Sequence, residues 1–147
     1  MISKVYRPQK IEKQIYRLWE KTGYFNPDNL PFKQRKKTFS IIMPPPNAND
    51  PLHIGHAVFV TLEDIMIRYH RLKGEITLWL PGTDHAGFET QVVFEKKLEK
   101  EGKSRFQMTR EEFYQAILRY TQQNRKTVRK QLKLLGASCD WSREKFT

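Results

Sequence analysis

Two short motifs in this sequence carry residue types that bind anions and amines. The first, His53-Ile54-Gly55-His56, places two imidazoles at the predicted start of a helix. Unpaired backbone N–H groups and the helix dipole attract anions there, and neutral imidazoles donate hydrogen bonds to phosphate oxygens. Gly55 has no side chain, so a flat ring is able to lie directly on the backbone. These features predict a site for a phosphate group and a planar base.

The second motif, Pro81-Gly82-Thr83-Asp84-His85-Ala86-Gly87, supplies a carboxylate. Asp84 is suited to hold an ammonium group, so the two motifs together predict binding of ATP and an amino acid. Taken singly, His53 and His56 also fit two surface histidines, or a metal site completed by His85 or Asp84. Asp84 alone also fits a turn residue. The joint occurrence of the motifs favours the ligand site.

The elements predicted around these motifs place them at one edge of a sheet. Residues 38–43 are a β-prone run that ends at Pro44-Pro45-Pro46, because proline donates no ladder hydrogen bond. A helix is predicted from about Gly55 to Leu72, and residues 75–80 form a second predicted strand. This strand–helix–strand has the size of a parallel βαβ unit, whose ligands bind beyond the carboxyl ends of the strands. We therefore expect three of the four histidines and Asp84 on one rim.

The other segments are predicted to be helical, which gives an α/β fold. Ile11, Ile15, Leu18 and Trp19 fall at helical spacing before a stop at Gly23. A second helix is predicted at residues 89–100, and Thr109-Arg110-Glu111-Glu112 is a capping box that opens a long helix to Gly136. The helix that begins near Gly55 has an apolar stripe, composed of Val58, Leu62, Ile65, Met66, Tyr69 and Leu72.

Composition restricts the class of protein. The 147 residues, of which 38% are apolar and 18 are aromatic, suit one domain or part of a larger one and exclude a disordered tail. The single cysteine, Cys139, excludes an internal disulfide. No apolar run approaches the roughly 18 residues that a membrane helix needs, and residues 1–10 lack a signal-peptide core. We expect a soluble cytoplasmic protein without membrane contact.

The charge is strongly basic, with 27 Lys and Arg against 16 Asp and Glu and a net charge of +11. Such an excess favours polyanions, including nucleic acid. A basic run lies in the predicted linker Asn26–Lys37. The long helix carries further cations, which suit either a tRNA-facing surface or a solvated face: Arg125, Lys126, Arg129, Lys130 and Lys133.

The motifs resemble those of class I aminoacyl-tRNA synthetases. His53-Ile54-Gly55-His56 matches the first signature of that class letter for letter. Where the isoleucine and leucine enzymes carry Gly-Trp-Asp, this chain has Gly82-Thr83-Asp84, as in the valine enzymes. Further segments are similar to the valine enzymes, and the likeness runs from about Tyr6 to Thr147: Pro44-Pro45-Pro46-Asn47, Leu80–Gly87 and Gly136…Asp140-Trp141-Ser142.

This resemblance implies the first half of a Rossmann-like nucleotide-binding fold. Residues 1–37 would be an N-terminal helix and linker, and residues 38–147 the N-terminal half of the catalytic domain. Pro44 and Pro45 would form the valine pocket, and Asp84 would pair with the ammonium group of valine. The implied ATP contacts are Asn47, His53, Gly55 and His56, with His53 and His56 as the catalytic residues.

The implied reaction joins valine and ATP to give valyl-adenylate and pyrophosphate, followed by transfer to the 3′ end of tRNA(Val). The two histidines would stabilise charge on the phosphoryl oxygens, and neither would act as a general base, because the attacking carboxylate is already ionised. Mg²⁺ would bridge the phosphates without a dedicated protein site, so no protein metal ligand is predicted.

The chain departs from the family pattern in three places. Asp50 stands where the family usually has glycine, and Phe88-Glu89 where the valine enzymes have smaller apolar residues. The residues up to Thr147 contain no Lys-Met-Ser-Lys-Ser loop, editing domain or anticodon-binding helices. We therefore expect either an N-terminal fragment, whose partner is the C-terminal half of the same enzyme, or a stand-alone remnant. Exposed apolar surface would make such a fragment self-associate or leave it only marginally stable.

Two other functions fit parts of the sequence. A basic nucleic-acid-binding remnant would account for the charge, and its binding would depend on salt. Another nucleotidyltransferase with a His-x-Gly-His element would account for the first motif, but not for Gly82–Gly87 or the aromatic N-terminal helix.

Overall fold

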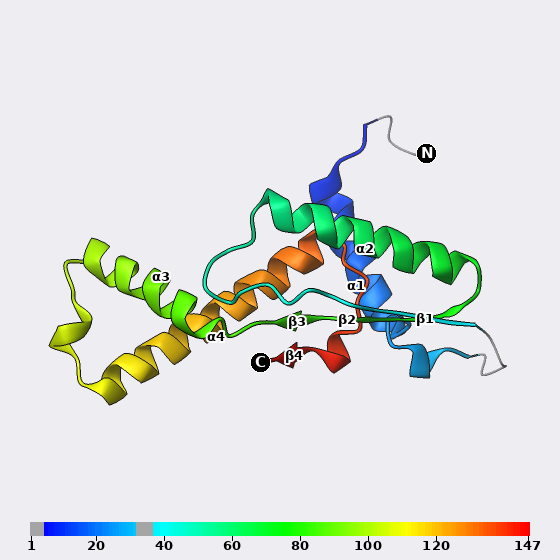
Figure 1. Ribbon diagram of the computed structural model, residues 1–147. Coiled ribbons are helices and arrows are strands. Elements are labelled where there is room, and N and C mark those ends of the chain that lie inside the picture. Colours follow the sequence, from blue (N-terminus) through cyan, green and yellow to red (C-terminus); the bar gives the residue numbers. More distant parts are fainter. Residues whose placement is uncertain (1–4, 32–36) are drawn as a thin grey trace.

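The computed structural model describes residues 5–31 and 37–147, so most of the predicted basic run of the linker lies outside the described residues. The helices are α1 (Pro8–Thr22), α2 (Ile54–Leu72), α3 (Gly87–Lys100) and α4 (Arg110–Leu134), with short 3₁₀ turns η1 (Pro27–Asn29), η2 (Arg105–Gln107) and η3 (Trp141–Arg143). The strands are β1 (Thr38–Ile42), β2 (Ile76–Leu80), β3 (Gly82–Thr83) and β4 (Lys145–Phe146). Figure 1 shows α2 along the β1–β2 pair, and α3 with the first half of α4 projecting away from it.

The predicted βαβ unit is confirmed. β1 pairs with β2 in parallel, from Thr38 opposite Ile76 to Ile42 opposite Leu80, and α2 makes the crossover between them. The last ladder bond runs from the Met43 N–H to the Leu80 carbonyl (2.9 Å). The strand ends there because the next residues are prolines, which have no N–H to donate.

A second parallel pair was not predicted. Gly82 lies opposite Lys145 and Thr83 opposite Phe146, so β4 pairs with β3, which follows β2 directly in the chain. Two-residue strands carry no alternation of apolar and polar side chains, and the partners are about sixty residues apart in the chain. This pairing brings the carboxyl-terminal segment of the described chain against the Gly82–Gly87 motif.

The core lies between α2, the β1–β2 pair and the second half of α4. It contains Met43, Val60, Ile67, Trp79, Val128, Leu132, Ala137 and Cys139. Trp79 is fully buried and donates its indole N–H to the Glu63 carboxylate (2.9 Å). Burial raises the pKa of Glu63, and the indole bond partly offsets that rise.

The apolar stripe of α2 points away from this core, although such a stripe usually faces inward. Its members are 44–89% exposed: Val58, Leu62, Ile65, Met66, Tyr69 and Leu72. The inward face is partly polar, and Asp64 accepts a hydrogen bond from the Ser138 N–H (3.0 Å) while Arg71 donates to the Thr77 hydroxyl (3.0 Å). Because these polar groups have partners inside the molecule, the helix packs on its less apolar side.

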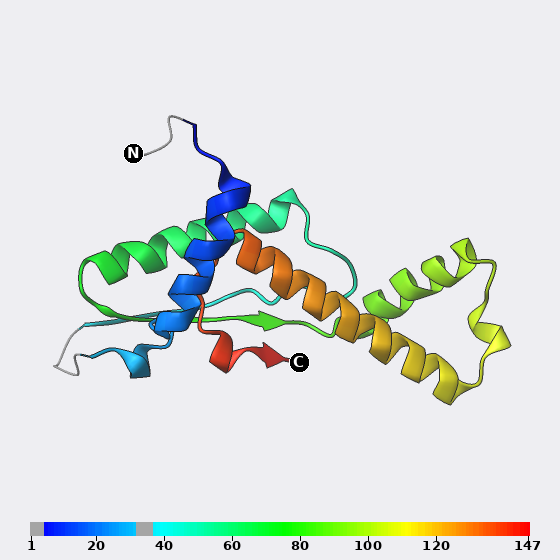
Figure 2. The ribbon, with the colours of Figure 1, turned by 180° about the vertical axis from the view of Figure 1, so that it is seen from behind.

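The aromatic N-terminal helix α1 packs against the end of α4, as Figure 2 shows from behind. Tyr16 is its buried residue, and its hydroxyl donates to the Ala137 carbonyl (2.7 Å) while accepting from the Trp141 indole (2.7 Å). Gly23 ends the helix at φ 70°, a left-handed conformation that glycine adopts without strain. The predicted helix and its stop are therefore confirmed.

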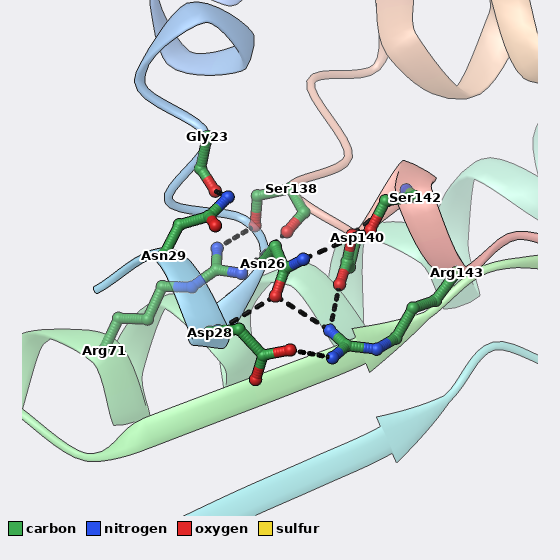
Figure 3. A network of polar contacts seen from close by, with 9 residues as sticks. All are labelled: Gly23, Asn26, Asp28, Asn29, Arg71, Ser138, Asp140, Ser142 and Arg143. Atoms are coloured by element: carbon green, nitrogen blue, oxygen red, sulfur yellow. Dashed lines mark hydrogen bonds and ion pairs between the residues drawn. The ribbon is translucent and has the colours of Figure 1, made fainter. Parts of the chain in front are cut away.

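A polar network ties the turn after α1 to the segment after α4 (Figure 3). Arg143 donates to the carboxylates of Asp140 and Asp28 and to the side-chain oxygen of Asn26. Asp140, which is only 2% exposed, also accepts hydrogen bonds from the N–H (3.0 Å) and hydroxyl (2.6 Å) of Ser142. The Gly136…Asp140-Trp141-Ser142 segment thus has a structural role of its own.

The cations of α4 are mostly used inside the molecule. Arg125 and Arg129 pair with Glu144, at 3.9 and 3.1 Å, and Lys133 pairs with Glu20. The other two lysines of the predicted set are exposed and make no ion pair within residues 5–31 and 37–147. The helix is therefore neither one open basic surface nor a face of solvated charges only.

Candidate functional site

A cleft of about 430 Å³ opens where β1 and α2 meet, beyond the carboxyl end of β1. Five of the predicted site residues line it: Pro44, Pro45, Asn47, His53 and His56. Gly55 and Asp84 are not among its lining residues. A larger groove of about 1030 Å³ runs between α1 and α4, but none of the predicted site residues lines it. The smaller cleft is therefore the candidate site.

The two motif loops meet, as their positions after parallel strands predicted. The Ala48 N–H donates to the Asp84 carbonyl (2.9 Å), and the Asp84 N–H donates to the Pro46 carbonyl (2.8 Å). His85, however, points elsewhere: its ring lies 6.0 Å from that of Phe146, and it does not line the cleft. Of the three histidines expected on this rim, His53 and His56 line the cleft, and His85 lies in the adjoining loop beside Asp84.

His53 and His56 cap the first turn of α2 with their own rings. The Nδ1 atom of His53 accepts the Gly55 N–H (3.0 Å), and Nδ1 of His56 accepts the His53 N–H (3.2 Å). A ring nitrogen that accepts a hydrogen bond carries no proton, so each neutral imidazole bears its proton on Nε2. The ring centroids are 4.1 Å apart. The cap therefore leaves two Nε2–H donors for a ligand.

Burial and the neighbouring His53 imidazole both favour the neutral form of His56, because a positive charge on His56 would repel a protonated His53. Burial is the larger cause, and together the two effects lower the pKa of His56 below its usual value of 6.5. Its ring is therefore neutral at pH 7. A neutral donor adds a hydrogen bond to a phosphate oxygen without holding the product by a full charge.

Gly55 is required by the His53 ring. A Cβ at this position would lie 2.8 Å from Cε1 and 3.0 Å from Nδ1 of His53. The His53 imidazole lies against the backbone at Gly55, beside the place where the sequence predicts a planar base. Because Gly55 has no side chain, the His53 ring can approach the backbone at the start of α2 and accept the Gly55 N–H.

We expect Gly55→Ala to lower activity far more than stability. The added methyl displaces the His53 ring, and for the predicted catalytic role of His53 a misplacement by about 1 Å costs roughly 10²-fold in rate. The alanine itself favours the helix, so the midpoint of thermal unfolding should change little. Gly87→Ala is the matched control, because a Cβ there has no heavy atom within 4 Å. An equal loss of activity in both variants would contradict this role of Gly55.

Asn47 has a partner that the sequence did not suggest. Its side-chain amide donates to the Glu89 carboxylate (2.6 Å), which lies in the first turn of α3. Glu89 belongs to the pair that departs from the family pattern, and its neighbour Phe88 is 78% exposed. Glu89 therefore fixes the amide of a predicted ATP contact, a role that a small apolar residue lacks.

Asp50 lines the cleft and is exposed. If this position needed a left-handed backbone, an aspartate in place of glycine would be strained, but among the described residues Ala86 is the only non-glycine residue with positive φ (51°). Asp50 therefore adds a negative charge at the cleft without backbone strain. Ala86 lies instead at the start of α3, within the second motif.

Asp84 forms hydrogen bonds through its backbone N–H, its backbone carbonyl and its side chain. Its carboxylate accepts the Thr147 hydroxyl, which is the main reason that the pKa of Asp84 lies below its usual value. Backbone N–H groups of Ala86 and His85 contribute in the same direction. Asp84 is thus an anion at neutral pH, as a partner of an ammonium group must be.

Within residues 5–31 and 37–147, no three His, Cys, Asp or Glu side chains are grouped so that they could hold a metal ion. Nor does any helix of that part have the length and apolarity needed to cross a membrane.

Comparison with known proteins assigns the family. The model of the tRNA synthetases class I (I, L, M and V) matches residues 14–147. The chain is 54% identical over 136 residues to the chloroplastic/mitochondrial valine–tRNA ligase 2 of Arabidopsis thaliana, covering 92% of this chain and 14% of that protein. It is 46% identical over 146 residues to the valine–tRNA ligase of Treponema denticola, covering 99% of this chain and 16% of that protein. The chain thus spans about a sixth of the length of these relatives.

A solved structure gives the same fold. The LeuRS of Agrobacterium radiobacter K84, in a ternary complex with tRNA and LeuAMS, superposes with a TM-score of 0.73 at 21% identity, over 97% of this chain and 16% of that one. The parallel βαβ arrangement agrees with the predicted first half of a Rossmann-like fold. On the family match and the shared fold, this chain belongs to the class I tRNA synthetases.

Proposed function

We propose that this chain is the amino-terminal part of a valine–tRNA ligase and activates valine with ATP. The observation that supports this proposal most directly is the cap formed by the two histidines. It leaves two neutral Nε2–H donors at the start of α2, where both rings line the cleft. The similarity to valine–tRNA ligases at 46–54% identity supports valine as the amino acid. The proposed products are valyl-adenylate and pyrophosphate.

In the proposed mechanism, the valine carboxylate attacks the α-phosphorus of ATP in line as pyrophosphate leaves. The residues need only position the reactants and stabilise charge on the phosphoryl oxygens. His53 and His56 donate to those oxygens through Nε2–H, and their geometry is set before ATP arrives. ATP enters as its magnesium complex, in which the phosphates themselves hold the ion.

The remaining roles follow the placement of the two loops. Pro44 and Pro45 form one wall of the cleft and are the proposed valine-pocket residues. Asn47, fixed by Glu89, and Gly55 contact ATP, and Asp84 pairs with the ammonium group of valine. Transfer to tRNA(Val) then requires the residues that lie beyond this chain in its longer relatives.

The proposal assigns the exposed apolar face of α2 to an interface with the rest of the enzyme. α2 packs on the β1–β2 pair, and its apolar stripe is exposed on the side that faces away from that pair. Residues 38–147 would thus be the first half of the catalytic domain, with residues 1–37 as its N-terminal helix and linker. The α2 stripe is where we expect the second half to pack.

Removing this apolar surface should make the isolated chain monomeric. Leu62 and Met66 lie one turn apart and are 57% and 44% exposed, so a Leu62→Lys/Met66→Lys variant is expected to fold normally. Analytical ultracentrifugation should show self-association of the unmodified chain and a monomer for the variant. A monomer in both cases would mean that the stripe does not drive association. An Arg119→Ala variant, altered at an exposed residue of α4, controls for a change at the surface as such.

The proposed activity is tested by valine-dependent ATP–pyrophosphate exchange on this chain, with threonine and isoleucine as comparators. A His53→Ala/His56→Ala variant gives the background rate. Exchange that needs valine and falls to background in this variant supports activation by the chain itself. If exchange is absent, the carboxyl-terminal part of the Treponema denticola relative is added in trans. Restored exchange supports the proposal for the assembled enzyme, and continued absence rejects it.

A further inference from the structure

The Gly82–Gly87 motif is held from outside by a segment that lies far from it in the sequence. β4 pairs with β3, the Lys145 N–H donates to the Pro81 carbonyl (3.1 Å), and the Thr147 N–H donates to the Thr83 carbonyl (3.4 Å). These bonds continue the parallel ladder to the residue next to Asp84. Residues 145–147 therefore lie in register with the motif.

β4 is itself anchored to the long helix. The guanidinium of Arg125 lies 4.1 Å from the centre of the Phe146 ring, and the same side chain donates to the Thr83 hydroxyl (3.3 Å). Arg125 also pairs with Glu144 just before β4. Two strands and α4 thus fix the position of Thr147.

The Thr147 hydroxyl makes two directional hydrogen bonds at the motif. It accepts the His85 N–H (2.9 Å), and it donates its own proton to the Oδ1 atom of Asp84. A hydroxyl has one proton, and the accepted bond orients the oxygen so that this proton points at the carboxylate. This bond gives Oδ1 a fixed partner and so sets the orientation of the Asp84 carboxylate.

We propose that Thr147 is a positioning residue for valine binding, which orients the Asp84 carboxylate through this hydroxyl. The inference rests on the proposed function, in which Asp84 holds the ammonium group of valine. Thr147 does not touch the substrate in this arrangement. It fixes the carboxylate so that the ammonium group is met without the cost of ordering the Asp84 side chain on binding.

The test is steady-state ATP–pyrophosphate exchange in the full-length enzyme that contains this chain. Thr147→Val keeps the shape of the side chain and removes the hydroxyl, so the KM for valine should rise about tenfold, with the KM for ATP unchanged. Thr147→Ser keeps the hydroxyl and should restore the KM for valine. Thr127→Val is the matched control, because its hydroxyl bonds only within α4 (to the Gln123 carbonyl, 3.2 Å).

Asp84→Asn separates this inference from the proposed function. A raised KM for valine in Asp84→Asn but not in Thr147→Val overturns the positioning role and leaves the proposed function intact. An unchanged KM for valine in Asp84→Asn overturns the assignment of Asp84, and the inference with it. Equal increases in the KM values for valine and ATP in Thr147→Val would show a general loss of structure, which also overturns a specific role.

Discussion

Replacing His53 or His56 by alanine is expected to lower kcat for valine activation by about 10²- to 10³-fold in each case, the usual cost of removing one preorganised donor to a developing anion. The loss should be larger in the double variant, but smaller than the product of the single losses, because the two rings share one cap. Their Nδ1 atoms bind backbone N–H groups of the same helix start, and their centroids are 4.1 Å apart. The measurement is single-turnover formation of valyl-adenylate.

His85→Ala is the matched control for this prediction. His85 lies in the second motif, but its ring faces Phe146 outside the cleft. Its loss should leave the rate within about threefold of the unmodified enzyme, since a distant side chain stabilises no charge on the reacting phosphate. A His85→Ala rate as low as that of the single His53 or His56 variants would show that His85 also acts at the site. It would contradict the placement of its side chain outside the cleft. A wild-type rate in the His53→Ala variant would reject the donor role.

A His53→Asn variant offers a finer distinction. The introduced asparagine can still cap the helix, because a short side-chain oxygen accepts a backbone N–H at this position. It cannot place a donor where Nε2–H of His53 lies. We therefore expect His53→Asn to recover the unfolding midpoint without recovering the rate, which separates the cap from the catalytic donor.

Local chemistry made β1, β2 and the meeting of the two loops predictable. The three prolines must end β1, and parallel strands must deliver their following loops to one edge. These rules depend only on the residues themselves and on the topology. For the same reason the capping box at Thr109 and Glu112 and the stop at Gly23 were predicted correctly.

The inward faces of α2 and β2 were not predictable, because both elements have two surfaces suited to burial. Ile76, Leu78 and Leu80 alternate along β2, yet the fully buried residue is Trp79 on the other face. On α2 the apolar stripe is likewise the exposed side. Periodicity shows that a face is apolar but not which partner covers it. Under the proposed function, the more apolar face of α2 is the one that packs against the rest of the enzyme.

Hydrogen bonds between side chains far apart in the chain could not be predicted from the sequence either. Glu89 lies 42 residues from Asn47, and Thr147 lies 63 residues from Asp84. No spacing rule joins such positions, and each residue alone is an ordinary exposed polar side chain. Only the parallel pairing of β3 with β4 and the start of α3 beside the first loop bring these partners together.

Asp140→Ala is expected to be the most destabilising single substitution considered for this chain, lowering the free energy of unfolding by about 2–4 kcal/mol. Asp140 is 2% exposed, caps η3 through Ser142 and accepts the guanidinium of Arg143. Removal takes away a cap and a charge-assisted bond together. Because Arg143 also bonds Asn26, the turn after α1 should loosen with it (Figure 3). Urea unfolding followed by tryptophan fluorescence measures the loss.

Asp28→Ala is the control that makes this prediction specific to burial. Asp28 binds the same Arg143, but its side chain is 71% exposed, and ion pairs at the surface contribute about 1 kcal/mol or less. Asp140→Asn should fall between the two, because its amide oxygen still accepts the Ser142 N–H while the charge is lost. The expected order of destabilisation is Asp140→Ala, then Asp140→Asn, then Asp28→Ala. If Asp28→Ala were as damaging as Asp140→Ala, the stability would come from the Arg143 pairing itself and not from the buried cap, and η3 would be held by its surface contacts.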